Sequence, residues 1–92
     1  MRKYGKVDLN QKPLVAYAES LGASWLSMDS LGDGKPDGLL GYQGQTFLVE
    51  IKQPKGTLTA DQQAFIASWQ GSPVHVVRTA QDIDELLRKA AK

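Results

Sequence analysis

The strongest constraint on the fold is a pair of strand-like segments that flank a short glycine-containing turn. In residues 46–52 every second side chain is large and apolar, which is the period of a strand that buries one face. Residues 37–42 form a second candidate strand, and Gln43-Gly44-Gln45 lies between the two. A short glycine-containing connection between two such runs is typical of a β-hairpin. The sequence therefore predicts an antiparallel hairpin over residues 37–52.

Three helices and two more strands are predicted around this hairpin. Their bounds follow from caps, glycine stops and apolar spacing. Before the hairpin we predict a helix from Asn10 to Gly22, with Leu14, Tyr17, Ala18 and Leu21 inward, and a strand at 24–28. After the hairpin we predict a helix from the capping box Thr59–Gln62 to Gly71, with Phe65, Ile66 and Trp69 on one face, and a strand at 74–77. The last predicted element is a helix capped by Thr79, with Ile83, Leu86, Leu87 and Ala90 inward.

This order predicts an α/β fold of the type αβββαβα. The first three strands are expected to form an antiparallel meander. The fourth strand follows a helical crossover, which favours parallel pairing with a right-handed connection. A chain of 92 residues is short enough that we expect one domain, residues 1–92, in which residues 1–7 form a loose basic arm.

Two carboxylates of the hairpin are predicted to lie side by side. If Gln43-Gly44 is a two-residue loop, Tyr42 pairs with Gln45 and Asp37 lies directly across from Glu50. Like charges at such a position are destabilising unless they share a proton or hold a cation between them. A hard divalent cation such as Mg²⁺ suits paired carboxylates. Lys52 lies on the same face and could orient the attacking water or neutralise a phosphorane-like transition state.

Two features keep a plainer interpretation open. A three-residue loop would turn Asp37 to the opposite face of the sheet. Asp37 could also end the turn as an Asx residue, and Glu50 and Lys52 could belong to a solvated strand face. The joint occurrence of these residues on the two arms of one hairpin favours the cation site.

Composition excludes several classes of protein. The 41% hydrophobic and 23% charged residues are typical of a globular chain and not of a disordered one. The absence of cysteine excludes a disulfide scaffold and thiolate zinc. No apolar run reaches membrane-spanning length and no signal peptide is expected, so we predict an intracellular, cytoplasmic protein with no membrane partner. The net charge of +1 gives no support to a nucleic-acid partner by itself.

Several segments together resemble a known family. Gly34-Lys35-Pro36-Asp37 followed by Glu50-Ile51-Lys52 is similar to the signature of the PD-(D/E)XK nuclease superfamily, and the rest of the chain resembles its virus-type replication-repair nuclease (VRR-NUC) domain. The further segments that carry this resemblance are Asp8-Leu9-Asn10-Gln11, Gly41-Tyr42, Phe47-Leu48-Val49, Leu58-Thr59-Ala60-Asp61-Gln62 and Val76-Val77-Arg78. They cover residues 8 to 87. The resemblance implies a restriction-endonuclease-like core.

The resemblance also implies a set of site residues. Asp37 and Glu50 would be metal ligands for Mg²⁺ or Mn²⁺, with the Ile51 backbone carbonyl as a further ligand and Lys52 as the catalytic lysine. An acidic residue near the first helix is expected too, with Asp8 the first choice and Glu19 the reserve. Gln62 occupies the place of a glutamine near the site in such families, and its role as capping-box partner is an equal alternative.

The function that the resemblance implies is a metal-dependent endonuclease that hydrolyses DNA. The expected substrates are replication or repair intermediates, including four-way (Holliday) junctions, in a bacterium or a phage-infected host. Two symmetric cuts at a junction favour a homodimer. The alternatives are a nucleic-acid-binding or regulatory module on the same fold that does not cut, and a small interaction protein.

Basic and aromatic residues complete the candidates. Without the ligands Asp8, Asp37 and Glu50, the chain has 11 basic and 7 acidic residues, or +4, which is compatible with a phosphate backbone. Expected phosphate contacts are Lys6, Lys12, Lys35, Lys55 and Arg78. His75 is expected to be a strand residue without a catalytic role. Trp25 and Trp69 could stack on bases, but their predicted core faces favour packing.

Overall fold

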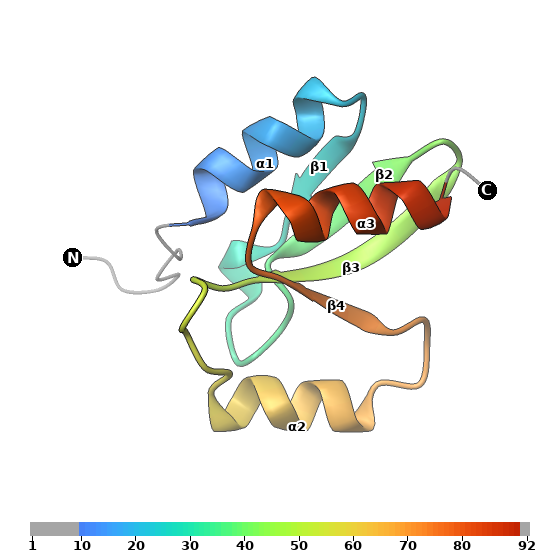
Figure 1. The fold of residues 1–92 in the computed structure, drawn as a ribbon. Coiled ribbons are helices and arrows are strands. Elements are labelled where there is room, and N and C mark those ends of the chain that lie inside the picture. Colours follow the sequence, from blue (N-terminus) through green and yellow to red (C-terminus); the bar gives the residue numbers. More distant parts are fainter. Residues whose placement is uncertain (1–9, 91–92) are drawn as a thin grey trace.

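The protein is a mixed α/β structure in which a four-stranded sheet is combined with three helices. The computed structural model describes residues 10–90. In chain order its elements are α1 (Gln11–Ser20), β1 (Ser24–Ser27), a 3-10 turn η1 (Asp29–Leu31), β2 (Gly38–Tyr42), β3 (Gln45–Ile51), α2 (Ala60–Ser68), β4 (Val74–Val77) and α3 (Ala80–Ala90) (Figure 1). In this part of the chain no helix has the length and apolar character needed to cross a membrane.

The sheet has the strand order β1-β2-β3-β4. Strands β1, β2 and β3 pair antiparallel, and β4 pairs parallel to β3, as the sequence predicts. Tyr42 is the partner of Gln45, so the hairpin loop has two residues. Gln43 and Gly44 both have positive φ, 48° and 81°, which is the conformation of a type I′ turn. This register excludes the three-residue loop.

One face of the sheet carries the core. The pairing of Leu40 with Phe47 and of Gly38 with Val49 places the odd-numbered residues of β3 on this face. Val49 and Ile51 are buried there against apolar side chains of α1 and α3. The even-numbered residues of β3, including Glu50, therefore point to the opposite face. Helix α2 lies apart from α1 and α3, and none of its residues is buried (Figure 1).

Two apolar residues lie outside the core that the sequence predicts for them. Helix α1 ends at Ser20, so Leu21 becomes the C-cap and is 42% exposed, and the chain turns at Gly22 with a φ of 100°. Trp69 is the C-cap of α2 in an extended conformation and is 44% exposed. The prediction of buried positions for Leu21 and Trp69 is wrong, because each is the first residue after the end of its helix and is not covered by the core.

Other local predictions are confirmed. Trp25 is half-buried and packs against the core cluster. Thr79 accepts a hydrogen bond from the Asp82 N–H at the start of α3. The four residues of α3 that the sequence places inward are buried, namely Ile83, Leu86, Leu87 and Ala90.

Candidate active site

Asp37 is held across the hairpin by the backbone of the neighbouring strand. It immediately precedes β2, and continuation of the β2–β3 register places it opposite Glu50. Its Oδ2 accepts a hydrogen bond of 2.7 Å from the Ile51 N–H, and its carbonyl accepts one of 2.7 Å from the Met28 N–H. These bonds fix the carboxylate at the edge where β2 begins and β3 ends.

Glu50 is a buried acid on the face of the sheet away from the core. Its side chain is 3% exposed. Burial of a carboxylate costs free energy unless donors or a cation compensate it. Gln62 Nε2 donates a hydrogen bond of 2.8 Å to Glu50 Oε2. The acid is therefore held in place by a side chain from α2.

Gln62 serves the helix and the acid at the same time. Its Oε1 accepts from the Thr59 N–H at 2.9 Å, and its own N–H donates to Thr59 Oγ1 at 3.1 Å, which completes the capping box. Its Nε2 remains available for Glu50. One side chain thus completes the capping box and also contacts Glu50.

The Ile51 carbonyl points toward the same edge as Asp37. Within a strand, the N–H and C=O of one residue face the same neighbour. The Ile51 N–H bonds to Asp37, so the Ile51 carbonyl also faces the β2 side. By contrast, the Lys52 N–H bonds to the Val77 carbonyl on the β4 side. Asp37, Glu50 and the Ile51 carbonyl thus gather at one corner of the sheet.

Asn10 ties the start of α1 to the point where β3 and β4 separate. It occupies the N-cap position, but its side chain makes no capping hydrogen bond. Its Nδ2 instead donates to the carbonyl oxygens of Lys52 and Arg78, each at 2.8 Å. The Asn10 amide therefore links the chain segments that follow β3 and β4, where the two strands separate, and it fixes the backbone of Lys52.

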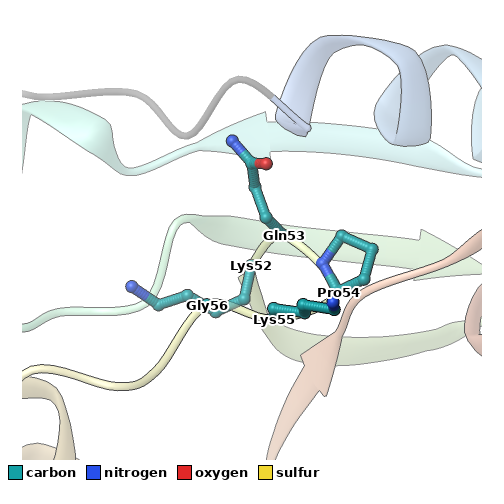
Figure 2. A pocket seen from close by; sticks show the side chains of 5 residues that line it. All are labelled: Lys52, Gln53, Pro54, Lys55 and Gly56. Carbon is teal, nitrogen blue, oxygen red and sulfur yellow. The ribbon is translucent and has the colours of Figure 1, made fainter.

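A hollow opens at the turn that follows β3. Its volume is about 600 Å³, and it is lined by one continuous segment, Lys52 to Gly56 (Figure 2). The turn closes through a 2.9 Å bond from the Gly56 N–H to the Gln53 carbonyl. Arg78 Nη1 donates to the carbonyls of Gln53 and Gly56. Arg78 thereby braces the turn that carries Lys52 and Lys55.

The loop before β2 approaches the N-terminus of α2 closely. A Cβ placed on Gly34, whose φ is 79°, would lie 2.4 Å from the Asp61 carbonyl oxygen. Only glycine allows this approach without movement of the backbone. Since Gln62 follows Asp61, the loop helps to place the residue that holds Glu50.

The structure separates Glu19 from Asp37 and Glu50. Glu19 lies in the last turn of α1, about 12 Å along the helix axis from Gln11 at 1.5 Å per residue. It lines a hollow that also includes Trp25, a residue on the core side of the sheet. Glu50 faces the other side. The preferred residue near the first helix, Asp8, lies outside the described residues.

The remaining basic residues are distributed around this corner and on α1. Lys35 is exposed in the loop before β2, Lys55 is exposed in the turn after β3, and Lys12 is exposed in the first turn of α1. Lys6 lies outside the described residues. Arg78 is half-buried, and its Nη1 is engaged by backbone carbonyls. Contacts of these side chains with phosphate remain predictions.

His75 lies on the core side of the sheet. It is the partner of Val49 in the β3–β4 ladder and packs edge-on against Phe47 with ring centroids 5.5 Å apart. Burial, followed by the positive charge of Lys89, lowers the pKa of His75 below its usual value of 6.5. His75 is thus directed away from Glu50.

The donor set at the corner fits a hard divalent cation. Between residues 10 and 90 no three Asp, Glu, His or Cys side chains gather closely enough to hold a metal ion by themselves. Asp37, Glu50 and the Ile51 carbonyl supply oxygen donors only. Magnesium is commonly bound by one or two carboxylates, with waters and substrate phosphates completing its coordination.

Sequence reasoning missed the bracing contacts around this corner. Asn10 is indistinguishable from an ordinary helix cap in the sequence, and Arg78 from an ordinary strand-end cation. Their partners are carbonyl oxygens, which carry no sequence signal.

Comparison of the sequence with family models and with curated proteins finds no match.

Proposed function

We propose that the protein is a Mg²⁺- or Mn²⁺-dependent endonuclease with a restriction-endonuclease-like core that hydrolyses phosphodiester bonds in DNA. The observation that carries this proposal is the buried Glu50, opposite Asp37 on the neighbouring strand, with Lys52 directly after it. The resemblance of these residues to the PD-(D/E)XK signature supports the same activity.

Each residue of the corner has a role in this proposal. Asp37 and Glu50, with the Ile51 carbonyl, hold the cation, and Asp8 is the proposed additional acid. Held by these residues, Mg²⁺ or Mn²⁺ would supply positive charge near the phosphate and activate the attacking water. The Lys52 ammonium orients that water and stabilises the charge that develops as the water oxygen bonds to phosphorus and the P–O bond to the leaving strand breaks.

Two contacts from outside the strands would keep this arrangement in place. Gln62 fixes the orientation of the Glu50 carboxylate through its 2.8 Å hydrogen bond. Asn10 fixes the Lys52 backbone through its carbonyl. A partner that orients a ligand typically affects metal affinity or activity by about 10- to 100-fold.

The proposed substrate is DNA of replication or repair, including four-way junctions. Lys35, in the loop before β2, and Lys55, in the turn after β3, suit phosphate contacts near the corner, and Lys12 and Arg78 are the further proposed contacts. A homodimer is part of this proposal, because a junction is resolved by two symmetric cuts. Sedimentation of the free protein at micromolar concentration measures its oligomeric state, and a strict monomer would contradict the dimer.

The function is tested by incubation of linear, supercoiled and four-way-junction DNA with Mg²⁺, Mn²⁺ or EDTA. We expect cutting with either metal and none in EDTA. Lys52→Met is expected to lower the rate by about 10²- to 10³-fold, because it removes charge stabilisation at the reacting phosphate. Lys89→Met is the control, an exposed lysine in the last turn of α3 beside His75 on the core side of the sheet, and it should keep cleavage within about twofold of wild type. Cutting that survives in EDTA or in Lys52→Met contradicts the mechanism, and binding without cutting favours a non-cutting module.

Gln62→Glu separates the two roles of this side chain. Glutamate also accepts from the Thr59 N–H, so the capping box is kept. It cannot donate to Glu50, and it places a second carboxylate there. We expect cleavage to fall by about 10- to 100-fold with unchanged helix content by circular dichroism.

The control for this variant is the neighbouring Gln63→Ala, since Gln63 Nε2 donates a solvent-exposed hydrogen bond of 3.0 Å to the Leu58 carbonyl oxygen. Gln63→Ala should retain cleavage within about twofold, the range expected of a surface change of about 0.5 kcal/mol. Full activity in Gln62→Glu would show that the contact with Glu50 has no part in the reaction.

A further inference from the structure

One face of helix α2 runs from Gln62, which contacts Glu50 of β3, to the stacked rings of Phe65 and Trp69 at the end of the helix. Gln62, Phe65, Ile66 and Trp69 follow the i, i+3, i+4, i+7 spacing of one helix face. Gln62 bonds to Glu50. The rings of Phe65 and Trp69 stack with centroids 5.3 Å apart and an interplanar angle of 22°. The core uses little of this face, because no residue of α2 is buried.

The indole of Trp69 is exposed but held in one orientation. Phe65 stacks on it, and Trp69 is 44% exposed. A Cβ placed on Gly71 would lie 2.8 Å from Nε1 and 3.0 Å from Cε2 and Cζ2 of the indole, so a larger residue at this position would displace the ring. A large aromatic surface that is already oriented loses little conformational entropy when a flat ligand stacks on it.

We propose that Trp69, backed by Phe65, is a stacking platform for an unpaired base of the DNA strand that is cut at Glu50. This inference rests on the proposed function. Trp69 follows Gln62 by seven residues, or about 10 Å along the axis, which corresponds to about three nucleotides at 3.4 Å each. Bases of a single strand stack on exposed aromatic side chains in a sequence-tolerant manner.

The charge of this segment favours a base over the phosphate backbone as the bound group. Residues 60–73 contain no lysine or arginine and one acid, Asp61. Phosphate binding depends on basic side chains, which here lie around Lys52 and Lys55. The platform therefore selects DNA with a single-stranded segment beside the cut, such as a flap or a frayed branch, over continuous duplex.

Binding in EDTA tests the platform without any cleavage. Trp25→Phe leaves Trp69 as the sole tryptophan. We expect oligothymidylate to quench its fluorescence and an abasic oligonucleotide of equal length, which has the same phosphates, to leave it unchanged. Trp69→Leu should weaken binding of oligothymidylate by about tenfold, within the range of one base–aromatic stack, and Trp69→Phe should weaken it less. Affinity for blunt duplex should stay within about twofold in all three variants.

Gly71→Ala provides a second variant that keeps both rings but displaces the indole, and it should weaken oligothymidylate binding as Trp69→Leu does. The platform would be overturned if Trp69→Leu bound oligothymidylate as tightly as wild type with an unchanged circular dichroism spectrum. It would also be overturned if Trp69→Leu lost a dimer in sedimentation but kept its affinity for oligothymidylate. If the wild-type protein cuts DNA and Trp69→Leu binds oligothymidylate normally, the nuclease proposal stands and the platform is excluded. Quenching by a protein that never cuts would support the platform and exclude the nuclease.

Discussion

Glu50→Gln is expected to lower DNA cleavage by at least about 10³-fold, the scale of losing a group that stabilises charge at the reacting phosphate. The amide has the shape of the carboxylate and can still accept from Gln62, but it has no negative charge for a cation. The loss should appear in cleavage at saturating DNA and should persist at raised Mg²⁺ or Mn²⁺.

The same substitution should leave the fold intact. Glu50 is 3% exposed, so its charge is held away from water. A buried charge that serves a site usually costs stability, and its neutral isostere is as stable or more so. We expect the urea midpoint of Glu50→Gln to equal or exceed that of wild type. A large drop in midpoint would assign Glu50 a structural role instead.

Glu19→Gln is the matched control for Glu50→Gln. Glu19 is exposed in the last turn of α1 and lies with Trp25 on the core side of the sheet. Cleavage by Glu19→Gln should stay within about twofold of wild type. A loss as large as that of Glu50→Gln would mean that the reserve ligand binds the cation after all.

Leu40→Ala is expected to lower the free energy of unfolding by about 2–5 kcal/mol, the range for a buried leucine whose cavity collapses incompletely. Leu40 is 1% exposed in the central strand β2, and its partners are Trp25 in β1 and Phe47 in β3. A domain of this size has about 5–14 kcal/mol in total at 0.05–0.15 kcal/mol per residue. The variant should therefore lose a large share of its stability, and its Tm should fall by more than about 10 °C.

Leu39→Ala removes the same atoms from the adjacent residue. Leu39 points to the other face of the sheet and is half-buried, so its loss should cost about 1 kcal/mol, the average for point substitutions. Urea unfolding of the two variants measures the difference between the faces. Equal losses would mean that the face opposite α1 and α3 is packed as tightly as the core.

The hairpin could be predicted because its signals are local. The turn Gln43-Gly44 and the alternation of residues 46–52 together determine the register, and the register places Asp37 opposite Glu50. The capping box of α2 is equally local, since Thr59 and Gln62 are three residues apart. Such features depend on steric and hydrogen-bonding preferences of a few neighbouring residues.

The contacts that complete the site could not be predicted in this way. The bond of Asn10 to the Arg78 carbonyl spans 68 residues, and its acceptor is a backbone atom that every residue possesses. Helix ends caused the two errors in burial. The stripes of α1 and α2 continue in the sequence through Leu21 and Trp69, but the chain leaves the helix one residue earlier in each case.

The lack of buried residues in α2 means that this helix should open more readily than α1 and α3, which both have buried residues. Segments with little buried apolar surface undergo local unfolding at a lower free energy than the core. Because Gln62 belongs to α2, each such opening withdraws the donor from Glu50 while the sheet stays paired. Heat should therefore inactivate the protein below its global Tm, and amide hydrogens of α2 should exchange on the path to that inactive state.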